Sequence, residues 1–224
     1  DASVGGKTGI NSDYGKNLIG AFHSPRKVII DSKWLKTLSD RDIAAGLAEV
    51  IKSGFIADAS ILEIMKNFEI DRDRDNSNLL NQLIEKSVSV KAQVVNTDFK
   101  ESYQREVLNY GHTLGHAVER HSNFSLRHGE AVSIGLVFAA HLSAKHCGLS
   151  ESDVSLHIEL LKKIGLPISY ERGALPQLHA LMSVDKKSRG NTLRFVGLSS
   201  PGKTQRIEGL SIEDLSAAYE KITQ

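Results

Sequence analysis

Apolar residues recur at helical spacing along most of the chain, and this periodicity predicts a mainly helical fold. The clearest stripe runs from Leu79 to Val95 and indicates one long helix. Another helix is expected to start at Ser39, which forms a capping pair with Asp42, and to run to Gly54. Further helices are expected over residues 59–68, 103–121, 128–147, 152–164, 174–184 and from 211 to the C-terminus.

Four other segments depart from the helical period. The first 17 residues are rich in glycine, serine and asparagine and are predicted to form a loop. The β-branched run 27–31 predicts a short buried strand, whereas the mixed charges of 69–78 predict a connector without structure of its own. Near the C-terminus, 192–198 and 204–208 flank a Ser-Ser-Pro-Gly turn and predict a small β-hairpin.

The composition excludes several classes of protein. The 28 Lys and Arg residues balance 27 Asp and Glu residues, and a net charge of +1 gives no field that favours nucleic acid as a partner. No run approaches the ~20 apolar residues of a membrane span, so no membrane partner is expected. The single cysteine, Cys147, excludes a disulfide framework and a thiolate zinc cluster and favours a cytoplasmic location.

The strongest candidate chemistry is a pair of histidines, His112 and His116, in the segment NYGHTLGH. Their spacing of four residues places both on one face of a helix. His128 begins the next predicted helix, and an antiparallel turn over 122–127 would bring it back near His112. Glu49 interrupts an otherwise apolar helix face and would supply the oxygen ligand of an open His₂Glu zinc site.

Ordinary alternatives remain open at this point. A histidine pair at this spacing is also common on helix surfaces and in satisfied cores, and Glu49 can simply pair with Lys52, three residues further on. Other histidines have no matching partner pattern and are treated as ordinary: His121, His141, His146, His157 and His179.

The stretch Gly5-Gly6-Lys7-Thr8-Gly9 has the composition of a phosphate-binding loop but lacks the Walker A spacing. Several polar residues also stand beside apolar or glycine-rich stretches rather than in solvated charge runs: Lys16, Asn17, Lys52, Lys91, Arg105, Lys186 and Lys187. Gathered around one pocket, these cations would suit a small substrate with two anionic ends. Taken singly, each cation is more simply a surface charge.

Five segments resemble the 3-dehydroquinate synthase family: DASVGGKTGIN, GKNLIGAF, AGLAEVIKSG, REVLNYGHTLGHAVE and RHGEAVSIGLVFAA. They run in the family's order from residue 1 to about residue 148, and looser similarity continues to the last helix. The resemblance implies a two-domain enzyme of the α/β plus α type. Residues 1–38 would be the tail of an N-terminal NAD-binding α/β domain, with substrate loops and a strand. Residues 39–224 would form a helical domain that binds the metal and substrate.

The resemblance also implies roles for individual residues. A zinc or cobalt ion would be bound by Glu49, His112 and His128. Catalytic roles would fall on Lys7, Lys52, Arg105, Asn109 and His116. Substrate would be bound by Asp1, Lys16, Asn17, Lys91 and Lys187, with Lys186 as the alternative to Lys187. NAD would be contacted by Lys7 and Lys16.

The implied reaction converts the sugar phosphate 3-deoxy-D-arabino-heptulosonate 7-phosphate into 3-dehydroquinate and phosphate in the shikimate pathway. A hydroxyl is oxidised by NAD⁺, phosphate is eliminated, the carbonyl is reduced and the ring closes by an aldol step. The resemblance further suggests a homodimer. The family's dinucleotide-binding glycine motif is missing, so we expect a piece of a longer protein that binds Zn²⁺ but shows no turnover alone.

Three other functions stay open beside this one. A valiolone- or inosose-type sugar-phosphate cyclase would share the zinc site but differ in the polar residues of the pocket. A metal-dependent alcohol dehydrogenase would not need the cluster of anion-binding lysines. A non-enzymatic, metal-stabilised helical module would use the histidines for structure only.

Overall fold

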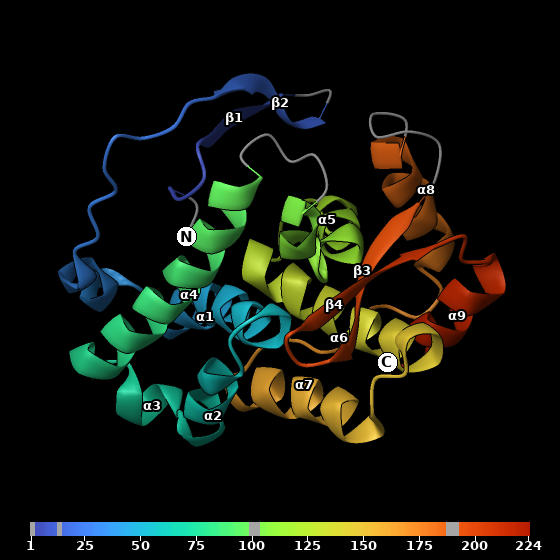
Figure 1. Cartoon of the computed structure of the whole chain (residues 1–224). Helices are drawn as coiled ribbons and strands as arrows, with labels where there is room; N and C mark the ends of the chain where they lie inside the picture. Colours follow the sequence, from blue (N-terminus) through green and yellow to red (C-terminus); the bar gives the residue numbers. More distant parts are fainter. Residues whose placement is uncertain (1–2, 13–14, 99–103, 187–192) are drawn as a thin grey trace.

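The computed structural model describes residues 3–12, 15–98, 104–186 and 193–224. These residues form a mainly helical body with two small antiparallel hairpins (Figure 1). The α-helices are α1 (Asp40–Ile56), α2 (Ala59–Asn67), α3 (Ile70–Asp73), α4 (Ser77–Thr97), α5 (His112–His121), α6 (His128–Cys147), α7 (Glu151–Lys163), α8 (Leu175–Lys186) and α9 (Ile212–Glu220). Two 3₁₀ helices are η1 (Ser32–Thr37) and η2 (Gln104–Asn109). The strands are β1 (Lys7–Ser12), β2 (Gly15–Phe22), β3 (Arg194–Ser200) and β4 (Lys203–Glu208).

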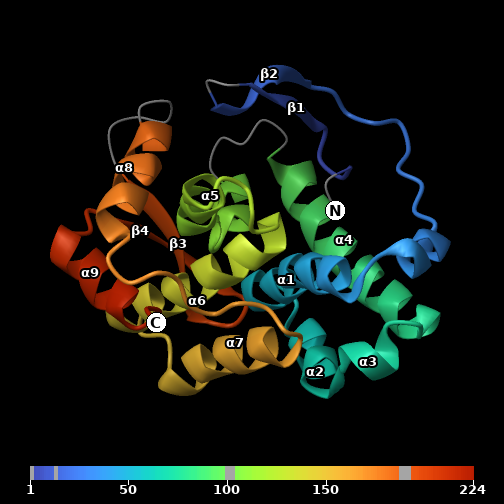
Figure 2. The same ribbon diagram turned by 180° about the vertical axis from the view of Figure 1, so that it is seen from behind.

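Helix α6 is the centre of the core. Nearly all of its residues from Gly129 to Ser143 are buried, as expected for a helix that is apolar around its whole circumference. It packs against α1, α5, α7, α9 and β3, and these elements surround it in both views (Figures 1 and 2). Because α1 and α5 both pack against α6, residues far apart in the sequence can meet beside it.

The predicted caps and most predicted elements are confirmed. Ser39 accepts a hydrogen bond from the Asp42 amide at the start of α1, and Ser211 forms a capping box with Asp214 at the start of α9. The long helix, the short helix after α1, the helices at α6 to α8 and the C-terminal hairpin all lie where the sequence predicts them. In the described part of the chain, no helix combines the length and apolarity needed to cross a membrane.

Two predictions for the first 31 residues are wrong. The expected loop contains the β1–β2 hairpin, in which Ile10 pairs with Ile19. Backbone hydrogen bonds hold this ladder, and its many glycines hide the two-residue period that predicts a strand. The expected buried strand at 27–31 instead has no regular secondary structure and pairs with no strand among the described residues. Its Ile29 and Ile30 are 82% and 51% exposed.

Two helical boundaries also differ from prediction. The connector 69–78 contains the single-turn helix α3, because the Asp73 carboxylate accepts a hydrogen bond from the Glu69 amide. The single helix expected over 103–121 is divided into η2 and α5, which are separated by Tyr110 and Gly111. Gly111 has a φ of 77°, a left-handed conformation that glycine adopts without strain and that interrupts a helix.

Candidate metal centre

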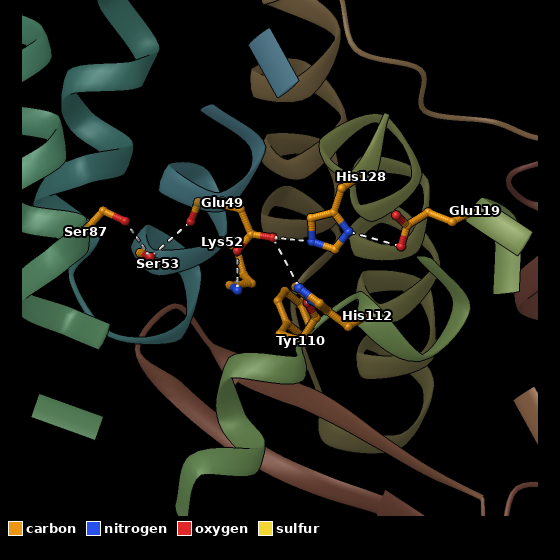
Figure 3. A network of polar contacts seen from close by, with 8 residues as sticks. All are labelled: Glu49, Lys52, Ser53, Ser87, Tyr110, His112, Glu119 and His128. Carbon is orange, nitrogen blue, oxygen red and sulfur yellow. Dashed lines mark hydrogen bonds and ion pairs between the residues drawn. The ribbon is translucent and has the colours of Figure 1, made fainter. Parts of the chain in front are cut away.

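Three helices each bring one candidate ligand to the same place (Figure 3). Glu49 lies in the middle of α1, whereas His112 and His128 are the first residues of α5 and α6. The break at Gly111 is what makes His112 the first residue of its helix. The turn between α5 and α6 then returns the chain so that the His112 and His128 ring centroids lie 5.2 Å apart, as the sequence predicts.

Helices α1 and α6 meet closely because Gly129 has no side chain. A Cβ atom at Gly129 would overlap the backbone carbonyl of Ala45 on α1. Beside this contact, the guanidinium of Arg41 on α1 donates to both carboxylate oxygens of Glu130 on α6, at 2.5 and 2.7 Å. The close crossing at Gly129 and this bidentate ion pair at Glu130 hold the two helices together next to His128.

The candidate ligand atoms are near one another. Oε1 of Glu49 lies 3.2 Å from Nε2 of His112 and 3.2 Å from Nε2 of His128. His116, one turn along α5, adds a third imidazole, and one nitrogen from each of the three rings lies within 4.8 Å of the others. The His116 ring centroid is 5.3 Å from that of His112 and 5.8 Å from that of His128.

The second ring nitrogen, Nδ1, of both His112 and His128 also has a hydrogen-bond partner. Nδ1 of His112 lies 3.0 Å from the Tyr110 carbonyl oxygen, and Nδ1 of His128 lies 3.1 Å from Oε2 of Glu119. Both partners accept hydrogen bonds, so each Nδ1 donates and each Nε2 is directed toward Glu49. An acceptor behind the ring is the usual way in which a metal-binding histidine is oriented.

Glu49 and Lys52 form a buried ion pair inside the centre. Nζ of Lys52 lies 2.5 Å from Oε2 of Glu49 and its side chain is only 5% exposed. Burial opposes ionisation of Glu49, but Lys52, His112 and His128 outweigh it and hold the pKa of this carboxyl well below its ordinary range. Burial also opposes the charged form of His128, yet Glu119 and Glu49 raise its pKa to about 9.

This donor set fits a divalent cation. One carboxylate oxygen and two oriented imidazole nitrogens are the ligands of open zinc sites, in which a further position is left for substrate or water. Glu49 therefore pairs with Lys52, as the simpler alternative predicts, but through Oε2 and in a buried position, while Oε1 faces the histidines.

The structure describes the side chains of some other predicted site residues, only the backbone of others, and two of them not at all. Arg105 is buried in η2, and its guanidinium donates to the Gly5 carbonyl at 3.1 Å, which joins it to the glycine-rich loop. Lys91 on α4 and Asn109 at the end of η2 are half-buried. The backbones of Lys7, Lys16 and Asn17 lie in the β1–β2 hairpin. The predictions for Asp1 and Lys187 lie outside the described residues.

Sequence reasoning missed three residues behind the ligands, namely Glu119, Tyr110 and His157. A signal for Glu119 exists, because it follows His112 by seven residues and so lies on the same helix face. His157 continues the apolar stripe of Val154 and Leu161 on α7, which predicts burial. Tyr110 acts through its backbone carbonyl, so no pattern of side chains predicts its role.

Two solved structures share this fold. The 2-epi-5-epi-valiolone synthase of Streptomyces hygroscopicus, with NAD⁺ and Zn²⁺ bound, superposes with a TM-score of 0.91 at 22% identity and covers 99% of this chain and 62% of that one. A 2-deoxy-scyllo-inosose synthase complexed with carbaglucose-6-phosphate, NAD⁺ and Co²⁺ superposes with a TM-score of 0.79 at 25% identity, over 98% of this chain and 63% of that one. The helical body is thus the fold of a part of these synthases.

Sequence comparison defines the relationship further. The model of the 3-dehydroquinate synthase C-terminal region matches residues 46–188, and that of the N-terminal region matches residues 1–45. The chain therefore belongs to the 3-dehydroquinate synthase family. It is 48% identical to the 3-dehydroquinate synthase of Mycolicibacterium vanbaalenii and 50% identical to that of Corynebacterium glutamicum, over its whole length. The chain spans 62% of the length of each of these relatives.

Proposed function

We propose that the chain is the metal-binding and substrate-binding part of a 3-dehydroquinate synthase. The observation that carries this proposal is the convergence of Glu49, His112 and His128. In this function 3-deoxy-D-arabino-heptulosonate 7-phosphate is converted to 3-dehydroquinate and phosphate, a step of the shikimate pathway. The identities of 47–50% to eight proteins named 3-dehydroquinate synthase support it.

We propose that Glu49, His112 and His128 hold a Zn²⁺ or Co²⁺ ion. Such an ion supplies Lewis acidity to hydroxyl oxygens of a bound substrate and a template for their orientation. The role of Glu49 in this centre is to offer Oε1 while Oε2 stays paired with Lys52. His116 is proposed to remain outside the ligand set and to relay a proton to or from a substrate oxygen, since its ring adjoins both ligand rings.

The proposed substrate is an anion at both ends, and the cations of the chain are proposed to bind it. The buried Lys52 and Arg105 would fix and neutralise the charged groups, because cations in a dry site need little reorganisation when the anion arrives. Further substrate contacts are proposed for Lys7, Lys16, Asn17, Lys91, Asn109, Asp1 and Lys187.

NAD⁺ is proposed as the second cofactor, since NAD⁺ is bound in both solved relatives, and it supplies the hydride acceptor when bound. The residues of this chain proposed to contact it are Lys7 and Lys16. In this proposal 1–38 is the end of the NAD-binding domain and 39–224 is the metal- and substrate-binding domain. We further propose a cytoplasmic homodimer, by analogy with the family.

A valiolone- or inosose-type activity is the competing proposal within the same fold. The valiolone and inosose synthases are only 22% and 25% identical to this chain, against about half for the dehydroquinate synthases. This difference favours the dehydroquinate reaction.

A chimeric enzyme tests the activity. In it, this chain replaces the matching 62% of the Corynebacterium glutamicum synthase, which supplies the remaining part. We expect release of phosphate and formation of 3-dehydroquinate from 3-deoxy-D-arabino-heptulosonate 7-phosphate, and loss of both in the Glu49→Gln chimera. A chimera that binds Zn²⁺ and NAD⁺ but turns over only sugar phosphates without a carboxylate would overturn the proposal.

A further inference from the structure

His157 is a fully buried polar residue on α7, behind the metal centre. Its ring stacks on Phe55 of α1, with ring centroids 3.4 Å apart and planes inclined by 10°. Its Nε2 atom lies 2.9 Å from the hydroxyl of Tyr110, and its Nδ1 atom lies 2.7 Å from the backbone carbonyl of Asp153. Both ring nitrogens are therefore used, although the residue is far from solvent.

The direction of these hydrogen bonds follows from the partners. A carbonyl oxygen only accepts, so Nδ1 of His157 carries the proton and donates a hydrogen bond to the backbone carbonyl of Asp153. Nε2 then has a lone pair, and the Tyr110 hydroxyl donates to it. The ring is neutral in this arrangement, which agrees with its burial. The Tyr110 hydroxyl is thus hydrogen-bonded to His157, whose tautomer is determined.

Tyr110 is also tied to a proposed metal ligand, but through its backbone. Its carbonyl oxygen accepts the hydrogen bond from Nδ1 of His112 at 3.0 Å. Tyr110 and Gly111 form the break between η2 and α5, so no continuous helix holds this carbonyl in position. The side chain of Tyr110, which is completely buried, supplies the anchor that the backbone lacks.

On the basis of the proposed metal centre, we infer that His157 is a positioning residue for His112. By accepting the Tyr110 hydroxyl, His157 holds the Tyr110 carbonyl where it keeps the proton of His112 on Nδ1. Nε2 of His112 then faces Oε1 of Glu49, where its lone pair would bind a metal ion held by both. The stack on Phe55 also connects His157 to α1, the helix that carries Glu49.

A role in filling the core alone predicts a different outcome from a positioning role. A core role is reported by the unfolding free energy, whereas a positioning role is also reported by the tautomer of His112 and the affinity for metal. Gln at position 157 can place an acceptor near the position of Nε2, and Phe can fill the space without one. Tyr110→Phe removes the same hydrogen bond from the other side.

The experiment measures two quantities on the purified chain. The first is the tautomer of His112 in the metal-free protein, from ring nitrogen NMR shifts. The second is the dissociation constant for Zn²⁺, from titration against a competing chelator. The control is Leu160→Ala, which removes buried apolar contacts from the same helix but none of the hydrogen-bonding groups of His157 and Tyr110.

We expect the wild type and His157→Gln to keep the proton of His112 on Nδ1. His157→Phe and Tyr110→Phe are expected to show mixed tautomers and a Zn²⁺ affinity about 10-fold weaker or more, as for other groups behind metal ligands. Leu160→Ala is expected to lower stability with a Zn²⁺ affinity within about threefold of wild type.

A single His112 tautomer and unchanged Zn²⁺ affinity in both Phe variants would overturn the inference. So would an equal loss of affinity in Leu160→Ala. If the wild type binds no Zn²⁺, the proposed metal centre fails, but the tautomer of His112 in the four variants still decides whether His157 positions it.

Discussion

Oε1 of Glu49 lies 3.2 Å from Nε2 of His128, although 79 residues separate the two along the chain. The two residues belong to different helices, so their distance depends on how α1 and α6 cross. The crossing in turn depends on Gly129 and on the Arg41–Glu130 ion pair. The metal centre is therefore a property of the packed core, and changes in packing alter metal binding.

A methyl group at the crossing tests this dependence. We expect Gly129→Ala to lower the free energy of unfolding by about 2 kcal/mol and to weaken Zn²⁺ binding, because its Cβ would meet the Ala45 carbonyl. The matched control is Gly46→Ala on the exposed surface of α1, where an added Cβ would meet no neighbouring atom within 4 Å. We expect Gly46→Ala to raise the free energy of unfolding by about 1 kcal/mol. Urea unfolding measures both, and an equal effect of the two substitutions would contradict the close crossing.

The carboxylate behind His128 gives a second prediction. Glu119→Gln keeps the size of the side chain but removes the charge that orients the ring, so we expect about 10-fold weaker Zn²⁺ binding. Competition with a chelator measures the dissociation constant. Glu220→Gln, on the exposed end of α9, is the control and should leave it unchanged. Unaltered affinity in Glu119→Gln would mean that the hydrogen bond does not orient the ligand.

Replacing the buried Lys52 tests whether its ammonium and a bound metal ion neutralise the same carboxylate, Glu49. Lys52→Met removes the buried cation paired with Oε2 of Glu49, and we expect the metal-free protein to lose about 3 kcal/mol of unfolding free energy. Bound Zn²⁺ neutralises the same carboxylate, so the loss should shrink in saturating Zn²⁺. The control is Lys66→Met, which breaks an exposed pair with Glu63 at the same spacing and should change stability by roughly 0.5 kcal/mol or less. A loss in Lys52→Met that is equal with and without Zn²⁺ would contradict this.

The buried His157 predicts a dependence of stability on pH. Burial lowers the pKa of His157 to about 3 in the folded protein, against about 6.5 in the unfolded chain. Between these values the unfolded chain binds more protons, so stability falls as the pH falls, by up to about 1.4 kcal/mol per pH unit. His157→Gln cannot titrate, and its unfolding free energy should fall less steeply from pH 6.5 to 4.5. Parallel curves for the two proteins would contradict a buried neutral His157.

Much of the helical body can be predicted from the sequence, because helical periodicity and caps are local. Ser39 with Asp42, and Ser211 with Asp214, predict helix starts that the structure confirms. The β1–β2 hairpin escapes prediction because glycines interrupt the apolar residues of both strands. The run 27–31 has the composition of a buried strand, but burial requires a partner, which is missing among the described residues.

The candidate ligands could be predicted, whereas the roles of Tyr110 and His157 behind them could not. His112 and His128 follow from helical spacing and one antiparallel turn, and the structure brings them together. The hydrogen bond from His112 to the Tyr110 carbonyl depends on the left-handed conformation of Gly111, which interrupts the helix at this point. Contact between His157 and Tyr110 depends on how α7 packs, which no local pattern encodes.

Zn²⁺ stoichiometry measures the metal centre most directly. The purified chain, stripped with a chelator and dialysed against Zn²⁺, is expected to retain one ion per chain. Glu49→Gln and His128→Ala are expected to retain none, while His116→Ala and the control His179→Ala on α8 retain one. Retention of zinc by both Glu49→Gln and His128→Ala, or its absence from the wild type, would contradict a metal centre formed by Glu49, His112 and His128.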